Sequence, residues 1–195
     1  MFYKVVKMIL NLLLSIFFRF NVTGVQNVPL NDKFIICSNH ASNWDPLFIS
    51  IKFPRQVSWM AKKELFENKI LSYLILKLGS FPVTRGDTDI SAIKNSLKVL
   101  KNDGVLGIFP EGTRVQGFDI QNAKPGVALL TIKSKSRVVP IYIESNYKIF
   151  NKVKINIGEP IDYNMEDGKK LNSDEYSEIS KKILKSIYRL KLEDK

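Results

Sequence analysis

The sequence predicts a single α/β domain, built on a mixed, partly parallel sheet flanked by helices, with an amphipathic helix at its N-terminus. The chain has 195 residues, which is enough for one domain with a sizeable core. Short apolar runs of strand length alternate with segments of helical periodicity through most of it. Residues 1–20 are apolar and basic, and no acidic residue precedes Asp32. We therefore expect a helix over residues 1–20 and the α/β domain over residues 21–195.

The first helix is predicted to lie in a membrane interface. Its uncharged run, residues 8–18, is shorter than the roughly 20 residues needed to span a bilayer. No small-residue cleavage site follows that run, which argues against a secretory signal. Lys4, Lys7 and Arg19 would reach the headgroups while the apolar side chains enter the acyl boundary. The alternative is a helix that only covers the core of the domain.

Runs of β-forming residues, bounded by turn-forming residues, predict the strands. These runs are residues 34–37, 57–61, 81–83, 105–109, 138–144 and 153–157. Residues 21–31 contain Gly24 and Pro29, and we expect a loop or a short strand there.

Helical spacing of apolar residues places helices between and after these strands. A short helix is expected to start with Asp45 as N-cap and Pro46 as first residue, and to end before Pro54. Another is expected to be capped by Asp87 or Thr88. The helices are predicted over residues 46–53, 62–78, 90–100, 125–133 and 173–192. The last is acidic at its start and basic towards its end, which complements the helix dipole.

The formal net charge of +11 indicates an anionic partner, either a nucleic acid or a membrane. The charge is spread along the chain, and no helix-turn-helix, zinc-finger or RNA-recognition signature accompanies it. An anionic membrane surface is therefore the expected partner, and no nucleic acid is expected. The single cysteine excludes an intramolecular disulfide, which fits a reducing compartment. No Cys/His cluster has metal-ligand spacing, and no metal site is expected.

The only histidine, His40, stands just after the apolar run 34–37, and Asp45 follows it five positions later. On one continuous helix this separation would place the two side chains about 140° apart. A bend between them is therefore the better way to bring imidazole and carboxylate together. An aspartate that orients a histidine fixes its tautomer and makes it a usable general base. Taken alone, the pair is equally compatible with a turn histidine beside an N-cap aspartate.

Three further blocks follow in order. They are Gly79-Ser80-Phe81-Pro82-Val83-Thr84-Arg85, Phe109-Pro110-Glu111-Gly112-Thr113-Arg114 and Val138-Val139-Pro140-Ile141. Together with Asn39-His40 and Asp45, these blocks resemble the glycerolipid acyltransferase family, which includes the 1-acyl-glycerol-3-phosphate acyltransferases. Its first motif is N-H-x4-D and its third is F-P-E-G-T-R. The resemblance covers roughly residues 20–160.

The resemblance implies acyl transfer from an acyl thioester, acyl-CoA or acyl carrier protein, to the free hydroxyl of 1-acyl-glycerol-3-phosphate. The product would be phosphatidic acid, made for phospholipid synthesis at the cytoplasmic face of a membrane by a peripheral or monotopic protein. His40 would be the general base, oriented by Asp45, and no cofactor is expected. The sequence has no G-x-S-x-G nucleophile elbow, so we expect direct attack without an acyl-enzyme.

The expected substrate-binding residues are Arg85, Glu111, Gly112, Thr113, Arg114 and Lys63. Arg85 and Arg114 match the phosphate-contacting arginines of the family, and a guanidinium fork suits phosphate oxygens. Glu111 is implied to help bind the glycerol backbone or to shape the site. Lys63 is a weaker candidate for phosphates of the acceptor or of the carrier. The family's third motif often continues with serine where this chain has Val115, which puts the detail of the acceptor in doubt.

Several alternatives stay open at this level. Residues 62–78 suit an acyl-chain groove, although core packing explains the same pattern. Cys37 is a buried small residue or a nucleophile, and Ser42 is a turn residue or a nucleophile. The acceptor is 1-acyl-glycerol-3-phosphate, glycerol-3-phosphate or another lysophospholipid. A catalytically silent membrane-surface binding protein is the alternative of a different class.

Overall fold

The computed structural model describes residues 2–84, 89–163 and 171–191. Its strands are β1 (Arg19–Thr23), β2 (Phe34–Ser38), β3 (Val57–Lys62), β4 (Phe81–Val83), β5 (Val105–Ile108), β6 (Arg137–Ser145) and β7 (Lys152–Ile157). Its α-helices are α1 (Phe2–Phe17), α2 (Asp45–Lys52), α3 (Lys69–Lys77), α4 (Ile90–Lys101), α5 (Gly126–Ser134) and α6 (Ser173–Arg189). Short 3₁₀ helices are η1 (Val25–Asn27), η2 (Lys63–Phe66) and η3 (Ile120–Asn122).

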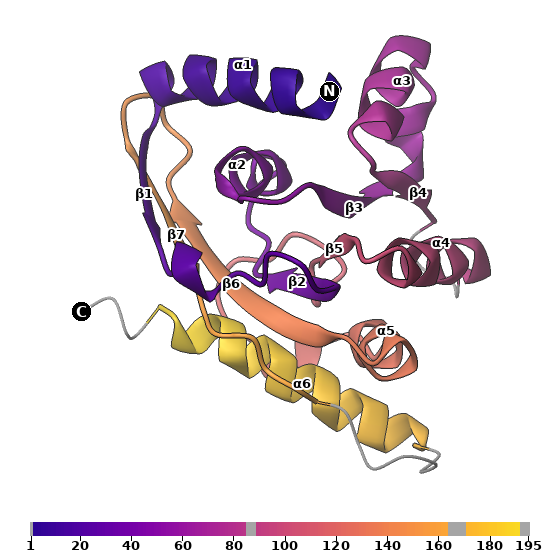
Figure 1. The fold of residues 1–195 in the computed structure, drawn as a ribbon. Coiled ribbons are helices and arrows are strands. Elements are labelled where there is room, and N and C mark those ends of the chain that lie inside the picture. The colour runs from indigo at the N-terminus through magenta and orange to yellow at the C-terminus, as the bar shows by residue number, and fades with distance from the viewer. Residues whose placement is uncertain (1, 85–88, 164–170, 192–195) are drawn as a thin grey trace.

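The strands form one seven-stranded sheet in the order β1-β7-β6-β2-β5-β3-β4. Neighbouring strands are parallel throughout, except that β6 and β7 are antiparallel. The sheet and its flanking helices confirm the predicted α/β fold (Figure 1). The parallel neighbours β2, β5 and β6 lie at the centre, where their carboxyl ends meet at one edge.

Each face of the sheet is covered, and side chains of β2 alternate between the two cores. Ile35 and Cys37 join a core formed with α4, α5 and α6. Phe34 and Ile36 join the opposite core, which contains residues of α2. Because successive side chains of a strand point to opposite faces, a strand buried on both faces is apolar at every position.

The helix expected over residues 62–78 is interrupted. Lys62 ends β3, η2 follows, and α3 starts only after Asn68. The Asn68 side chain accepts hydrogen bonds from the amides of Ile70 and Leu71 and so caps a new helix. None of the α3 residues is buried, so the core-packing interpretation of this segment is wrong.

Two other predicted boundaries differ from the structure. The N-terminal helix ends at Phe17, because Phe18 is buried in the core and Arg19 begins β1. The N-cap of α4 is Asp89, whose side chain accepts from the amide of Ala92. The expected caps at positions 87 and 88 lie outside the described residues.

Helix α1 lies along α2 and has no buried residue, although Leu14 packs against the core beneath it. Lys7 does not extend away from the domain as expected, because its ammonium donates a hydrogen bond to the carbonyl of Phe53. That carbonyl follows the last turn of α2, where a cation complements the helix dipole. Among the described residues, no helix is both long and apolar enough to cross a bilayer.

A glycine in β5 makes room for a tryptophan in the neighbouring strand. Gly107 pairs with Trp59, and a Cβ atom at Gly107 would lie 2.5 Å from Cε3 of the indole. The indole stacks on Phe109 with ring centroids 4.9 Å apart, and its Nε1 donates to Oγ of Ser50 at 2.8 Å. Trp59 thus connects β3 to α2 and to the loop after β5.

We predict that Gly107→Ala lowers the free energy of unfolding by about 1–3 kcal/mol, because the added methyl group overpacks this contact. The matched control is Gly126→Ala, since a Cβ at Gly126 meets no atom within 4 Å. The control should be neutral or slightly stabilising, because alanine favours a helix. Urea denaturation measures both, and equal stability of the two variants would contradict the prediction.

Candidate active site

The first and third sequence motifs meet at the carboxyl edge of the sheet. Asn39 and His40 follow β2, and Phe109 follows the neighbouring strand β5. Loops at the carboxyl ends of parallel strands commonly form the binding site of an α/β protein. The sheet therefore brings together two motifs that lie about 70 residues apart in the sequence, as the hydrogen bond from His40 to Glu111 shows.

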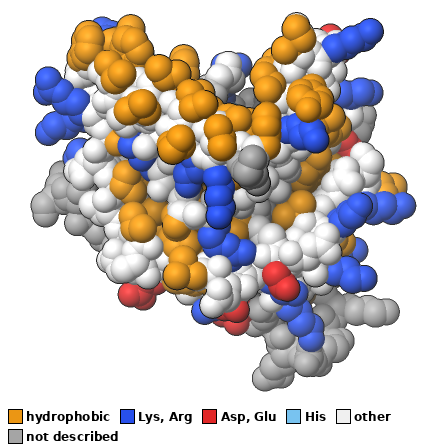
Figure 2. All heavy atoms as spheres, turned by 45° about the horizontal axis from the view of Figure 1, so that its top comes forward, with side chains coloured by type: hydrophobic (Ala, Val, Ile, Leu, Met, Phe, Trp, Pro, Cys, Tyr) orange, Lys and Arg blue, Asp and Glu red, His pale blue; other side chains and the backbone are white. Residues whose placement is uncertain are grey.

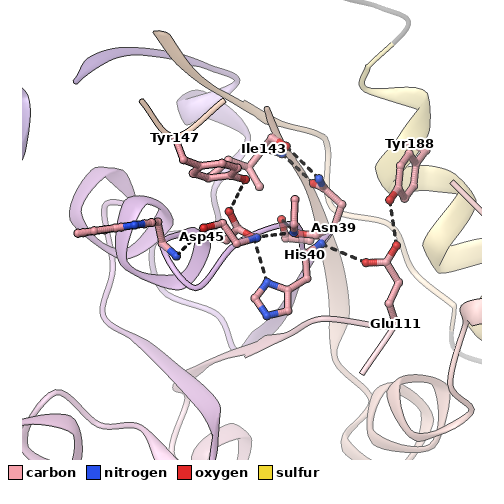
Figure 3. Close-up of polar contacts among 11 residues, drawn as sticks. Asn39, His40, Asp45, Glu111, Ile143, Tyr147 and Tyr188 are labelled. Carbon is pink, nitrogen blue, oxygen red and sulfur yellow. Dashed lines mark hydrogen bonds and ion pairs between the residues drawn. The ribbon is translucent and has the colours of Figure 1, made fainter. Parts of the chain in front are cut away.

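The imidazole of His40 and the carboxylate of Asp45 are in contact across the expected bend (Figure 3). Nδ1 of His40 lies 2.9 Å from Oδ2 of Asp45, and both residues are buried. A carboxylate only accepts hydrogen bonds, so Nδ1 carries the proton and Nε2 keeps its lone pair. No described residue forms a hydrogen bond with Nε2. The arrangement leaves one basic nitrogen available on an oriented ring.

Asp45 does not act as the expected N-cap, because it is the first residue of α2 and Trp44 is the N-cap. Its carboxylate instead turns back onto the preceding loop. Oδ2 accepts from the amides of Ala41 and Ser42, at 2.8 and 2.7 Å. Oδ1 accepts from the hydroxyl of Tyr147 at 2.7 Å. The donors compensate the cost of burying a negative charge.

The plane of the imidazole is held by aromatic stacking. The His40 and Phe109 rings lie 3.9 Å apart between centroids, with 13° between their planes. Phe109 in turn stacks on Trp59. The ring of His40 is therefore positioned edge-on by Asp45 and face-on by Phe109.

Glu111 holds the backbone of His40. Its Oε2 accepts from the His40 amide at 3.0 Å, and its Oε1 accepts from the hydroxyl of Tyr188 at 2.9 Å (Figure 3). Burial raises the pKa of Glu111 above its ordinary value. Of the two roles implied for Glu111, this geometry supports shaping the site, because both oxygens already have donors.

The carbonyl of His40 is held by the same loop, since it accepts from the amide of Val115 at 2.9 Å. This hydrogen bond uses the backbone of Val115. The departure from the serine common in the family therefore leaves it unaffected. Asn39 secures the other side, where its side-chain amide exchanges two hydrogen bonds with the backbone of Ile143 in β6 (Figure 3).

A cavity of about 830 Å³ opens beside the imidazole, within the size range of ligand sites. His40, Gly112 and Thr113 line it, as does Lys124 just before α5. Gly112 has φ 68°, a left-handed conformation that favours glycine, and this turn exposes the loop to the cavity. Lys124 is the only lysine or arginine among the described lining residues.

Two of the remaining predicted binding residues, Arg114 and Lys63, do not line this cavity. Arg114 is exposed and follows Thr113, but it is not among the lining residues. Lys63 is exposed in η2 and does not line the cavity either. Arg85 lies outside the described residues. The described ranges contain no group of three or more His, Cys, Asp or Glu side chains that could hold a metal ion.

Neither alternative nucleophile is hydrogen-bonded to the imidazole of His40. Cys37 is buried within β2, and burial raises the pKa of its thiol, which keeps it protonated. The hydroxyl of Ser42 accepts from the amide of Trp44 at 3.3 Å, and Ser42 therefore serves the turn between His40 and Asp45.

Sequence reasoning missed the two tyrosines that support the site. Tyr147 lies 102 residues from Asp45, and Tyr188 lies 77 residues from Glu111. No local motif marks either residue. Lys124 was also missed, although its place just before the Pro-Gly start of α5 was a signal for a residue at a helix N-terminus.

The chain is similar to proteins of known family. A family model described as Acyltransferase matches residues 19–144. The 1-acyl-sn-glycerol-3-phosphate acyltransferase of Streptococcus pneumoniae is 32% identical, over 100% of this chain and 75% of that protein. The protein of the same name from Bacillus subtilis is 33% identical, over 82% of each chain. The crystal structure of the LPA acyltransferase PlsC from Thermotoga maritima has a TM-score of 0.72 and 23% identity, over 97% of this chain and 81% of its own, and shares the fold.

We predict that Tyr147→Phe lowers the free energy of unfolding by about 1–3 kcal/mol, because it leaves a buried carboxylate oxygen of Asp45 without a donor. In a double-mutant cycle with Asp45→Asn, the two changes should be non-additive. Ser96→Ala is the matched control, since it removes a buried hydroxyl that donates to the carbonyl of Ala92 in α4, outside this network, and should add to Asp45→Asn. Urea denaturation of the six proteins provides the test, and additivity of Tyr147→Phe with Asp45→Asn would refute the contact.

A second prediction concerns pH. Because burial raises the pKa of Glu111, the folded wild type binds a proton more tightly than the unfolded chain. Stability from this group is therefore present below the ordinary pKa of 4.5 and is lost as pH rises through the raised folded value. The Glu111→Gln side chain cannot titrate in this pH range, so it does not contribute this pH dependence. The free energy of unfolding of wild type minus that of Glu111→Gln should increase as pH is lowered from about 7 to about 4. A difference that stays constant over this range would contradict the prediction.

Proposed function

The chain belongs to the acyltransferase family, as its motifs predict, and on that premise we propose that it acylates the free hydroxyl of 1-acyl-glycerol-3-phosphate, giving phosphatidic acid. The names of its relatives from Streptococcus pneumoniae and Bacillus subtilis support this acceptor. The observation that carries the proposal is the buried His40–Asp45 pair, with Nε2 of His40 unoccupied at the wall of a cavity.

In the proposed reaction His40 is the general base. Nε2 takes the proton of the acceptor hydroxyl as its oxygen attacks the carbonyl carbon of the thioester. The new C–O bond forms, and the tetrahedral intermediate then breaks its C–S bond. The leaving thiolate recovers the proton from the imidazolium. Asp45 stabilises the imidazolium between the two transfers and keeps Nδ1 in its donor role.

Direct transfer without an acyl-enzyme is supported by the positions of the alternative nucleophiles. Cys37 is buried, and Ser42 is used in the turn. The hydroxyl of the acceptor is then the only nucleophile that the reaction requires.

The acceptor phosphate is proposed to be bound by cations near the third motif. Arg114 follows Thr113, which lines the cavity, and Lys124 lines the cavity itself. Together with Arg85 they are the proposed phosphate ligands, because a phosphate needs compensating positive charge. Gly112 and Thr113 are proposed to contact the glycerol portion, and Lys63 remains the weakest member of the set.

An acyl chain is proposed to lie in an apolar groove of about 180 Å³ on the α2 side of the sheet. Its walls include Leu10 of α1, Leu65 of η2, and Ile75 and Leu78 at the end of α3. This placement supports the acyl-chain interpretation of residues 62–78. Trp59 also lines the groove, and its stack on Phe109 connects the groove wall to the ring beside His40.

The acyl donor is proposed to be a soluble thioester, acyl-CoA or acyl carrier protein, used without a cofactor. The acceptor is a lipid and stays in the bilayer, so the protein must act at the membrane surface. We propose peripheral or monotopic attachment at the cytoplasmic face through α1. The exposed apolar side chains of α1 and its exposed Lys4 support this attachment.

The test is to give the purified protein 1-acyl-glycerol-3-phosphate, glycerol-3-phosphate and other lysophospholipids with each donor, and to identify the products by mass. We expect phosphatidic acid from 1-acyl-glycerol-3-phosphate, and no product from a folded His40→Ala variant. Asp45→Asn should lower turnover by about 10³–10⁴-fold, as a triad aspartate does. Preference for another acceptor would change the proposed substrate. Near-normal turnover by His40→Ala would overturn the proposed base.

A further inference from the structure

Helix α3 exposes apolar side chains to solvent. Ile70, Tyr73 and Leu76 are 76%, 57% and 53% exposed. These residues are spaced three apart and lie on the same side of the helix. The opposite side is apolar as well, because Ile75 and Leu78 line the groove. A helix with apolar side chains on two opposite sides is normally buried, either in a core or in a membrane.

The packing of α3 within the domain does not account for this composition. None of its residues is buried, and its main contact within the chain is with η2. At nine residues it is too short to be stable by itself in water. An exposed apolar patch of this kind marks an interaction surface.

The outer side of α1 has the same character. Its exposed apolar residues are Phe2, Val5, Met8, Ile9, Leu12, Leu13, Ile16 and Phe17. Helices α1 and α3 stand on the same side of the molecule, and hydrophobic side chains gather over both of them (Figures 1 and 2). They also form walls of the same groove, since Leu10 of α1 and Ile75 of α3 both line it. The two exposed apolar surfaces therefore flank one opening.

The charges on α1 and α3 indicate which kind of partner this surface binds. Neither α1 nor α3 contains an acidic residue, whereas Lys69 and Lys77 stand at the two ends of α3. The ammonium of Lys77 lies 5.6 Å from the ring centroid of Tyr73, so a cation accompanies the apolar side. Apolar side chains with lysines at the margin match an anionic bilayer surface, where lysines reach the headgroups.

We propose that α3 is a second membrane-binding helix, which rests with α1 on an anionic bilayer so that the groove between them opens into the lipid. This inference rests on the proposed function, which places α1 at the membrane. Two attached helices favour binding beyond either alone, because the second binds at high effective concentration once the first is bound. They also hold the domain in one orientation, with the groove facing the acyl chains.

The first test measures partitioning of the full chain onto vesicles of phosphatidylcholine and phosphatidylglycerol. The variant Ile70→Gln/Leu76→Gln removes apolar surface from α3 without touching the groove lining. We expect its partition coefficient to fall by about tenfold or more. The control Leu30→Gln/Ile90→Gln changes residues of similar exposure, 68% and 63%, outside both helices and should change partitioning by less than about twofold. Wild-type partitioning by a folded Ile70→Gln/Leu76→Gln protein would overturn the proposal.

The second test detects insertion directly. Ile70→Cys and, as control, Leu30→Cys are labelled with an environment-sensitive fluorophore, since the native Cys37 is buried in the folded chain. On the same vesicles the label at position 70 should shift its emission to the blue and be quenched by spin-labelled lipid. The label at position 30 should do neither. A label at position 70 that stays in an aqueous environment while the protein is bound would refute insertion of α3.

A second copy of the chain is the rival occupant of this surface, and sedimentation without vesicles distinguishes it. A wild-type dimer that Ile70→Gln/Leu76→Gln converts to a monomer, with unchanged vesicle binding, would assign α3 to self-association. Activity on a short-chain, water-soluble acceptor separates this proposal from the proposed function. Loss of vesicle binding with that activity retained supports α3 as a membrane contact. Absence of that activity in the wild type would count against the proposed reaction alone.

Discussion

The buried carboxylate of Asp45 is the constraint on which the site depends. A negative charge removed from water must be met by donors, and here it has four. They are Nδ1 of His40, the amides of Ala41 and Ser42, and the hydroxyl of Tyr147. The first three force the loop after β2 to fold around the carboxylate, and the fourth connects that loop to the segment between β6 and β7. One charge thereby fixes the tautomer of the histidine and the conformation of its loop.

The third motif completes this constraint from the other side. Glu111 and Val115 bind the amide and the carbonyl of His40, so the backbone of the histidine is held at both of its polar groups. Tyr188 in α6 donates to Glu111 and brings the C-terminal helix into the same network. The residues Phe109 and Glu111 of the motif are therefore architectural, since one stacks on the imidazole and the other holds its backbone.

The buried polar site contrasts with helices α1 and α3, whose apolar side chains are exposed. The polar network around His40 is buried and paired, which holds the imidazole in one geometry. Helices α1 and α3 are exposed and apolar, and they flank a groove whose wall contains Trp59. The stacked rings of Trp59, Phe109 and His40 connect the two regions. An exposed apolar surface and a buried polar corner thus share one small sheet.

The sequence by itself determined the α/β fold, the family and the pairing of His40 with Asp45, because these depend on local periodicity and on motifs that are each only a few residues long. It did not determine the helix boundary at Asn68, where a single side-chain cap interrupts a continuous apolar pattern. Only the tertiary structure decided that Tyr147 and Tyr188 support the site. The order of strands in the sheet brings Tyr147 there, and the packing of α6 against the sheet brings Tyr188. The tertiary structure also decided which sides of α1 and α3 face outward. An apolar pattern predicts only that a helix packs against an apolar surface, and the packing within the domain determines which side of the helix stays exposed.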